Sequence, residues 1–434
     1  MITSSVFAGK KYAVLGLARS GLATVDALLA SGAEVVAWDE KEEARAKVAD
    51  RVTLADPLEI DLTGFDGVVV SPGVPIIRHP IRQKTADAGV PLIGDIELFA
   101  LARPTLPPHK VVGITGTNGK STTTALIKHI LEVAGLPTLM GGNIGLPILS
   151  RDPLAPNDAG MGVYVLELSS YQIDLTYSLA CDIAVLLNVS PDHLDRYPDF
   201  GGYAASKTRL FGMQNSNGTA FIGVDDETGR EIARTVERIG KPRTFRFGRA
   251  QAGDQAGWPA LQGPHNAQNV VAAANVAMLL GVPGNVIDQA IASYPGLPHR
   301  MERVGERNGV LFVNDSKATN AMSTAPALAA YPKVHWILGG LPKSDELDAC
   351  APHYGHVVAA YTIGEAGPLF ANILRVAGKP VTESVTLEQA VKDAAAAAKP
   401  GEVVMLSPAC ASFDQFRDFE ARGDAFRAAV EALG

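Results

Sequence analysis

The stretch VVGITGTNGKSTTT, residues 111–124, constrains the fold more than any other part of the chain. An apolar run of strand-forming residues enters a glycine turn, and Lys120 and Ser121 then begin a segment whose apolar residues have helical spacing. A strand, a tight turn and a helix in this order form the first half of a βαβ unit, which builds parallel sheets flanked by helices. The stretch therefore predicts an α/β fold.

The same turn predicts a phosphate site. Backbone N–H groups at a helix N-terminus attract anions, and glycine allows a phosphate to come close. Lys120 would reach the outer phosphates of a nucleotide, and the Ser121 hydroxyl would bind Mg²⁺. The strict spacing G-x-x-x-x-G-K-[ST] is not met, because Ile114 stands at its first glycine. A plain turn with a solvated Lys120 is the alternative, but the strand before it and the amphipathic helix after it favour the phosphate site.

Alternating strand and helix patterns divide the chain into three regions. Residues 1–103 form the first, and the proline-rich RPTLPPHK (103–110) is typical of a linker. Residues 104–297 start again with the phosphate loop, and residues 298–434 form a third alternating set. We expect three α/β domains, each a mostly parallel sheet flanked by helices. The N-terminal and C-terminal domains would be Rossmann-like, and the central one a P-loop domain.

Composition sets broad limits on partners and location. The formal net charge of −8 disfavours a long nucleic-acid-binding surface, although a local cluster of Lys and Arg could bind a small acidic substrate. The three cysteines, Cys181, Cys350 and Cys410, have no metal-ligand spacing, which suits a reducing compartment. The N-terminal residues show no signal peptide and no membrane-spanning run. We expect a cytoplasmic monomer that binds neither nucleic acid nor membranes.

Two further strand ends carry polar side chains. Glu167 ends the apolar run in LELSS, where it could bind Mg²⁺ or simply face water. His193 lies between Asp192 and Asp195 after the next apolar run, and a lone histidine is more often structural. Because the carboxyl ends of parallel strands meet at one edge of a sheet, we expect Lys120, Glu167 and His193 around one crevice.

Eight motifs follow one another along the chain. They are TGTNGKST (115–122), GGNIG (141–145), LELSS (166–170), NVSPDHLDRY (188–197), HNAQN (265–269), GLPHRME (296–302), NDSKATN (314–320) and SPACASFDQF (407–416). In this order they resemble the Mur ligases of peptidoglycan synthesis over the whole chain. That family has a shorter phosphate loop, with the spacing seen here in G-T-N-G-K-S. GDIELF (94–99) and SPACASFDQF favour the member that adds D-glutamate to UDP-N-acetylmuramoyl-L-alanine.

The resemblance implies an ATP-dependent ligase. ATP would activate a carboxylate as an acyl phosphate, and the amine of D-glutamate would attack it to give an amide, ADP and phosphate. Two Mg²⁺ ions would neutralise the anions that meet in the site. Another Mur ligase, or a folylpolyglutamate synthase acting on a different carboxylate and amino acid, is the alternative within the ligases.

The resemblance also implies roles for individual residues. The ATP site would comprise Gly116, Thr117, Asn118, Gly119, Lys120, Ser121, Thr122, Asn269, Arg300 and Asp315. The UDP-sugar would contact Ser20, Asp39, Ser71, Gly73, Asn143, Ser169, Gln172 and His193. D-glutamate would contact Thr319, Lys343, Ser412 and Phe419. The catalytic residues would be Lys120, Glu167, His193 and Lys207, and the metal ligands Ser121, Glu167, His193 and Lys207, the last as a carbamate.

Local sequence leaves other interpretations open for several of these residues. Around Lys207, the helical segment 203–211 favours a solvated surface lysine, and only the resemblance implies a carbamate. Phe419 follows Phe413 and Phe416 at intervals of three, as a core stripe would.

Two more assignments in the third region have alternatives. Arg300 could form an interdomain salt bridge, and Asp315 could cap a turn before Ser316. Leu341 and Pro342 precede Lys343 where the family often has polar and glycine-rich residues, so the sequence does not fix the direction of Lys343.

Two enzyme classes outside the ligases compete for parts of this pattern. In GLARSG (16–21) a glycine turn precedes a helix as in an NAD-dependent dehydrogenase, but Ala18 replaces the middle glycine. A dehydrogenase would also leave the phosphate loop without a role. A GTPase would explain that loop, yet the nearest match to its guanine-reading Asn-Lys-x-Asp is PKSD (342–345), which lacks the asparagine.

Overall fold

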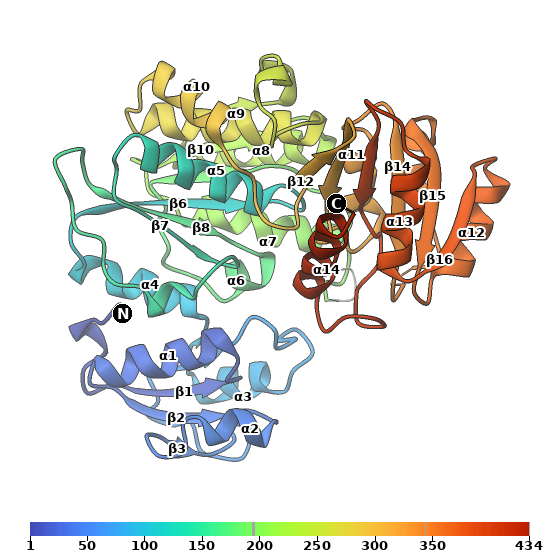
Figure 1. The fold of residues 1–434 in the computed structure, drawn as a ribbon. Helices are drawn as coiled ribbons and strands as arrows, with labels where there is room; N and C mark the ends of the chain where they lie inside the picture. Colours follow the sequence, from blue (N-terminus) through green and yellow to red (C-terminus); the bar gives the residue numbers. More distant parts are fainter. Residues whose placement is uncertain (193–195, 343, 434) are drawn as a thin grey trace. The chain divides into compact units, whose positions relative to one another are not determined.

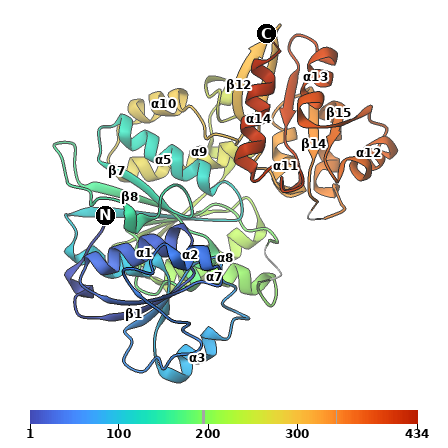
Figure 2. The same cartoon turned by 60° about the horizontal axis from the view of Figure 1, so that its bottom comes forward.

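The computed structural model describes residues 1–192, 196–342 and 344–433 (Figure 1). These residues form two compact units, Met1–Gln251 with Gln268–Ala290, and Ala252–Ala267 with Ile291–Gly434. The chain contains three sheets, each mostly parallel and flanked by helices, which confirms the predicted fold class (Figure 2). Within the described ranges, no helix has the length and apolar composition needed to cross a lipid bilayer.

The first sheet has five strands in the order β3-β2-β1-β4-β5, all parallel. Its strands are β1 (Lys11–Leu15), β2 (Glu34–Trp38), β3 (Thr53–Leu54), β4 (Gly67–Val70) and β5 (Leu92–Ile93). The accompanying helices are α1 (Arg19–Ala30), α2 (Glu42–Ala46), α3 (Ile81–Ala88) and α4 (Asp95–Ala102). The order changes direction at β1, so the loops after β1 and β4 are neighbours, as at a doubly wound crevice.

The second sheet has six parallel strands in the order β11-β10-β9-β6-β8-β7. They are β6 (His109–Thr115), β7 (Thr138–Gly142), β8 (Gly162–Glu167), β9 (Ile183–Leu186), β10 (Thr219–Gly223) and β11 (Arg243–Phe247). The helices are α5 (Lys120–Val133), α6 (Ser170–Asp174), α7 (Phe200–Gly212), α8 (Glu227–Ile239), α9 (Pro264–Leu279) and α10 (Gly284–Ser293). Strand β6 lies between β8 and β9, which places the phosphate loop beside the ends of both.

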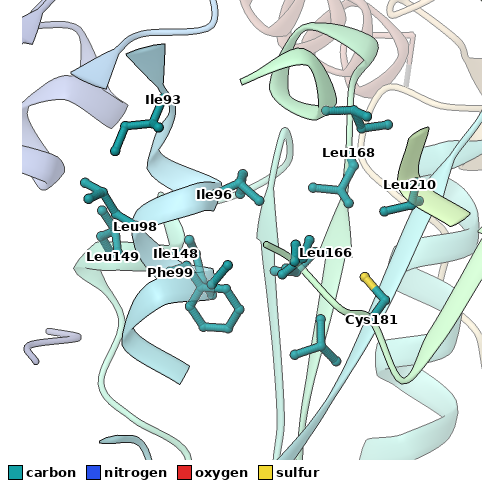
Figure 3. Packing of buried hydrophobic residues seen from close by; sticks show 14 of the residues in the cluster. Ile93, Ile96, Leu98, Phe99, Ile148, Leu149, Leu166, Leu168, Cys181 and Leu210 are labelled. Atoms are coloured by element: carbon teal, nitrogen blue, oxygen red, sulfur yellow. The ribbon is translucent and has the colours of Figure 1, made fainter. Parts of the chain in front are cut away.

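One apolar core joins the first two sheets within their compact unit. Figure 3 shows Ile96 and Phe99 of α4 beside Leu166 of β8, in the cluster that also contains Leu210 of α7. The segment predicted as a linker is a short 3₁₀ turn, Arg103–Thr105, followed within four residues by β6. Since β6 begins inside it, the proline-rich segment is only partly a connection.

The third sheet has six strands in the order β12-β13-β17-β14-β15-β16. They are β12 (Glu302–Arg307), β13 (Val310–Asn314), β14 (Val334–Gly339), β15 (Val357–Ile363), β16 (Val381–Val385) and β17 (Val403–Leu406). The helices are α11 (Ala321–Leu328), α12 (Gly367–Val376), α13 (Leu387–Ala397) and α14 (Phe419–Glu431), with a 3₁₀ segment at Asp348–His356. All pairs are parallel except β12–β13.

The antiparallel strand β12 was not predicted from the sequence. It forms a hairpin with β13 through Asn308 and Gly309, which both have positive φ (51° and 74°). Asn-Gly is the preferred pair for such two-residue turns, because both central residues need this left-handed conformation. The Asn308-Gly309 dipeptide was therefore the feature of the sequence from which this hairpin could have been predicted.

Candidate active site

Gly116 and Gly119 shape the phosphate loop between β6 and α5. Both have positive φ, 151° and 84°, which side chains rarely tolerate. A β-carbon on Gly119 would also collide with Oδ1 of Asn269, which accepts from the Thr123 hydroxyl at 3.2 Å. The loop therefore needs glycine both for its conformation and for the close approach of α9. Asn269, predicted at the ATP site, lies against the loop.

Two residues that sequence reasoning missed hold this loop in place. The side-chain oxygen of Asn188 accepts from the backbone N–H of Asn118 at 2.9 Å, and its Nδ2 donates to Oε1 of Gln268 at 3.0 Å. Gln268 in turn donates to Leu187 O and to Oδ2 of Asp225, at 2.9 and 2.8 Å. Both residues belong to quoted motifs, but spacing alone does not show that their amides meet.

We expect Gly119→Ala to raise the KM for ATP by about tenfold or more, because the new methyl group displaces Asn269. It should also lower the free energy of unfolding by about 1–2 kcal/mol, the cost of placing alanine at positive φ. Gly135→Ala is the matched control. It follows α5 at φ 79°, and the nearest side-chain atom to its β-carbon is 3.8 Å away. Equal KM values for the two variants in steady-state kinetics would contradict the role of this contact.

Two lysines converge on the carbonyl oxygen of Gly116. Nζ of Lys120 donates to it at 2.9 Å and also to Thr117 O at 2.8 Å. Nζ of Lys207 donates to the same oxygen at 2.9 Å, although the two residues are 91 positions apart. The fold thus brings a residue of α7 to the phosphate loop, and two lysine amino groups lie beside the place where phosphates would bind.

Lys207 is buried, so its interpretation as a solvated surface lysine is wrong. Only 1% of the residue is exposed, and Nζ lies 4.5 Å from the centroid of the Tyr203 ring. Burial, and after it the charge of Lys120, lower the pKa of Lys207 well below its usual value. A buried amine of this kind is held toward its neutral, nucleophilic form.

Glu167 is buried as well, at 2% exposure, and so does not simply face water. Its Oε1 accepts from Nδ2 of Asn143 at 3.0 Å, whereas Oε2 has no hydrogen-bond partner within the described residues. A buried carboxylate oxygen without a partner is costly and is a hard ligand that suits Mg²⁺. Ser121, at the first turn of α5, is also buried. These residues fit a divalent cation.

The proposed metal set extends beyond the residues that the structure describes. His193 lies outside them, as does its neighbour Asp195. Among the described ranges, no three His, Cys, Asp or Glu side chains converge in a way that could hold an ion. Of the four predicted metal ligands, the structure describes Ser121, Glu167 and Lys207.

A cavity of about 240 Å³ brings together four of the residues predicted for the UDP-sugar. Ser20 comes from α1, Gly73 from the loop after β4, Asn143 from the loop after β7 and Gln172 from α6. The buried carboxyl group of Asp95 also lines it. The residues thus come from four separate segments, and Asn143 connects this cavity to Glu167.

The other predicted UDP-sugar residues have structural contacts of their own. The Asp39 carboxylate accepts from the backbone N–H groups of Leu17 and Lys41, at 2.6 and 2.9 Å, and so holds the turn after β1. Ser71 donates to Gly16 O at 2.8 Å. Ser169 is the N-cap of α6 and forms a capping box with Gln172.

In the other compact unit, Asp315 is buried at the end of β13. Its two carboxylate oxygens accept from the Ser407 hydroxyl at 2.8 Å and from Met301 N–H at 3.2 Å. The N–H of Ser316 instead donates to Asn314 Oδ1, so Asp315 is not the turn cap. Burial raises the pKa of Asp315 to about 7, and the nearby positive charge of Arg300 opposes this shift.

We expect Asp315→Asn to stabilise the fold while it impairs turnover. The folded-state pKa of about 7 exceeds the ordinary 3.8, so the native state binds the proton more tightly and wild-type stability falls as pH rises from about 4 to about 7. The asparagine side chain has no proton to lose in this range, so the variant keeps its stability. Wild type loses about 2–4 kcal/mol of its free energy of unfolding by pH values above 7. Urea unfolding at pH 5 and 8 measures it, with the exposed Asp348→Asn as control. A variant no more stable than wild type at pH 8 would contradict the shift.

Two of the residues predicted for D-glutamate, Thr319 and Ser412, lie on loops that follow strands β13 and β17 of the third sheet. Ser412 is buried, Thr319 is half-buried, and Phe419 begins α14, with Nζ of Lys317 3.7 Å from its ring centroid. Lys343 lies outside the described residues. The helix begins only at Phe419 and Phe413 is 69% exposed, so the phenylalanines form no helical core stripe.

Comparison with known proteins identifies the family of this chain. The Mur ligase middle domain matches residues 114–259, the Mur ligase glutamate ligase domain residues 299–410, and the MurD-like N-terminal domain residues 10–94. The UDP-N-acetylmuramoylalanine–D-glutamate ligase of Novosphingobium aromaticivorans is 64% identical over all of this chain and 97% of its own. The chain belongs to the Mur ligase family.

Other relatives of this Mur ligase are similar over their whole length. The UDP-N-acetylmuramoylalanine–D-glutamate ligase of Sphingopyxis alaskensis is 60% identical over the full length of both chains. The solved structure of the MurF ligase of Thermotoga maritima in complex with ADP has a TM-score of 0.61 at 18% identity, covering 99% of this chain and 97% of that one, and shows that the fold is shared. The dehydrogenase and GTPase alternatives are therefore wrong, and this Mur ligase is an ATP-using ligase.

Proposed function

We propose that this Mur ligase joins D-glutamate to UDP-N-acetylmuramoyl-L-alanine at the expense of ATP, in the cytoplasmic synthesis of peptidoglycan precursors. The observation that carries the proposal is the identity of 58–64% with three ligases of that name over the whole chain. In this proposal the phosphate loop would bind ATP, the cavity lined by Ser20 and Asn143 the sugar nucleotide, and the loops of the third sheet D-glutamate. Two Mg²⁺ ions and a monomeric enzyme are part of the same proposal.

The reaction needs a better leaving group than a carboxylate provides. An oxygen of the L-alanyl carboxylate attacks the γ-phosphorus of ATP, ADP leaves, and an acyl phosphate forms. The amine of D-glutamate then attacks the carbonyl carbon, phosphate leaves with the bonding electrons, and the nitrogen loses a proton. Lys120 and the N–H groups at the start of α5 oppose the charge of the phosphates throughout.

Ser121, Glu167, His193 and Lys207 would hold the metal ions. Bound Mg²⁺ would offset the negative charge of the phosphates and of the acyl carboxylate. Glu167 suits such an ion, because one of its buried carboxylate oxygens has no hydrogen-bond partner in the described part of the chain, and Asn143 holds the other. Asn143 would thereby link the orientation of Glu167 to the sugar-nucleotide cavity that it lines.

We propose that Lys207 carries a carbamate. Its amine would attack carbon dioxide and lose a proton, which leaves a carbamate anion in place of an ammonium. Burial supports this, because a neutral amine is the form that reacts and because an ammonium beside Lys120 would repel a divalent cation. The Gly116 carbonyl at 2.9 Å shows that Nζ already reaches the phosphate loop.

The proposal can be tested by phosphate release with a panel of amino acids. Purified enzyme, ATP, Mg²⁺ and UDP-N-acetylmuramoyl-L-alanine should release phosphate with D-glutamate and not with L-glutamate, L-lysine or meso-diaminopimelate. UDP-N-acetylmuramate without the alanine serves as the control acceptor. Release with a different amino acid at the same rate, or with the control acceptor, would assign the chain to another member of the ligase group.

A further inference from the structure

Arg422 is a buried cation that is not among the residues proposed to bind substrate or metal. It lies in the first turn of α14, and only 1% of it is exposed. Its guanidinium forms no ion pair with a carboxylate of the described residues; every hydrogen bond it donates goes to a carbonyl or hydroxyl oxygen. Burial lowers its pKa to about 10, so it remains charged at neutral pH. A buried charge without an anionic partner is costly, which suggests that it is kept for its position.

The guanidinium connects loops from three different strands. Nε donates to Ser316 Oγ at 3.0 Å and Nη2 to Ser316 O at 2.8 Å, in the loop after β13. Nη2 also donates to Cys410 O at 3.0 Å and Nη1 to Ala411 O at 3.1 Å, in the loop after β17. Ala411 pairs with Leu341 through two backbone hydrogen bonds of 3.0 Å, which adds the loop after β14.

These contacts are one to three residues from the residues proposed to bind D-glutamate. Ser316 precedes Thr319 by three positions, and its hydroxyl donates to Phe419 O at 2.8 Å. Ala411 directly precedes Ser412. All of these groups belong to one compact unit. A planar group with five fixed donors can hold several carbonyls at defined angles, which a lysine cannot do.

We propose that Arg422 is the positioning residue of the D-glutamate site, whose guanidinium fixes the loops that carry Thr319, Ser412 and Phe419 and so sets the affinity for the amino-acid substrate. This inference rests on the proposed function. The positive charge of Arg422 would also favour binding of D-glutamate, which brings two carboxylates. The carboxyl group of Asp414 acts on the guanidinium through its charge but forms no ion pair with it.

The test compares Arg422→Lys, Arg422→Met and Ser316→Ala with the control Arg427→Met. Arg427 lies on the same helix but pairs with Glu302 and Asp424 near the surface, with 31% of its side chain exposed. Steady-state kinetics give the KM for D-glutamate and for ATP, calorimetry gives the affinity for the sugar nucleotide, and thermal unfolding gives Tm. Ser316→Ala is included because it removes one hydroxyl, which accepts from Nε of Arg422 and donates to Phe419 O, and should fold even where the arginine variants do not.

We expect Arg422→Lys and Arg422→Met to raise the KM for D-glutamate by about tenfold to a hundredfold, with less than about a threefold change in sugar-nucleotide affinity. Ser316→Ala should raise it by about threefold to tenfold, and Arg427→Met by less than about twofold. An unchanged KM for D-glutamate in folded variants would overturn the inference. So would a parallel loss of Tm and of all three substrates' binding, or equal effects in Arg427→Met. Wild-type enzyme that does not use D-glutamate would instead refute the proposed function.

Discussion

Lys207→Arg should lower turnover by several orders of magnitude, as much as Lys207→Ala does. Arginine keeps the positive charge, but a guanidinium cannot take up carbon dioxide and presents no oxygen to a metal. Carbamate formation changes the charge at this buried position by two units, so no cationic substitute can replace it. The arginine is also longer than the lysine, which is 1% exposed and lies against Tyr203, and it must disturb Gly116.

The experiment assays wild type, Lys207→Ala and Lys207→Arg side by side. Acetate should partly restore Lys207→Ala, since a small carboxylate can occupy the place of the carbamate. Lys241→Arg is the control, because Lys241 also donates to a backbone carbonyl, Gly212 O at 3.0 Å, at the exposed end of α7. Turnover by Lys207→Arg near the wild-type value would refute the carbamate.

Lys120→Ala should abolish ADP formation and leave the affinity for the sugar nucleotide nearly unchanged. Nζ of Lys120 lies over the phosphate loop, where it donates to Gly116 O and Thr117 O, and ATP phosphates would offer it charged acceptors in place of these neutral ones. The cavity that groups Ser20, Gly73 and Gln172 does not include Lys120. The loss in kcat/KM should be about a thousandfold or more, the usual scale for a lost charge contact to a phosphoryl group.

Lys128→Ala provides the matched control for Lys120→Ala. Lys128 lies on the same helix, two turns further along, where it forms an exposed i,i+4 ion pair with Glu132. Its removal should cost less than about 0.5 kcal/mol of stability and no activity. Calorimetry that shows an equal loss of ATP and sugar-nucleotide binding in Lys120→Ala would mean that the two sites are not separate.

Local sequence predicted the strands and helices well because their signals are short-range. The apolar run 111–115, the glycine turn and the amphipathic α5 lie where they were expected. The ends of strands depend on longer-range contacts: β1 stops at Leu15, since the backbone after it belongs to the turn that Asp39 holds. Strand β12 was missed because its sequence, ERVGER (302–307), does not alternate between apolar and polar residues.

The chemistry of the candidate site was only partly visible in the sequence. Lys120 and Glu167 stand at strand ends, so the geometry of a parallel sheet predicted their meeting at one edge, and β6 and β8 are indeed adjacent. Asn188 and Gln268 were not singled out, because nothing in their neighbourhoods shows that two amides 80 residues apart share a hydrogen bond.

The sequence alone determined three parallel-sheet domains, the position of the phosphate loop and the residues that begin its helix, since each follows from periodicity and turn chemistry within about twenty residues. Tertiary structure alone decided which polar side chains are buried. Periodicity shows that a helix has two faces but not which neighbour covers the polar one. Lys207 and Arg422 therefore resemble surface cations in the sequence, whereas packing against the loops after β6, β13 and β17 removes both from water and aims them at backbone oxygens.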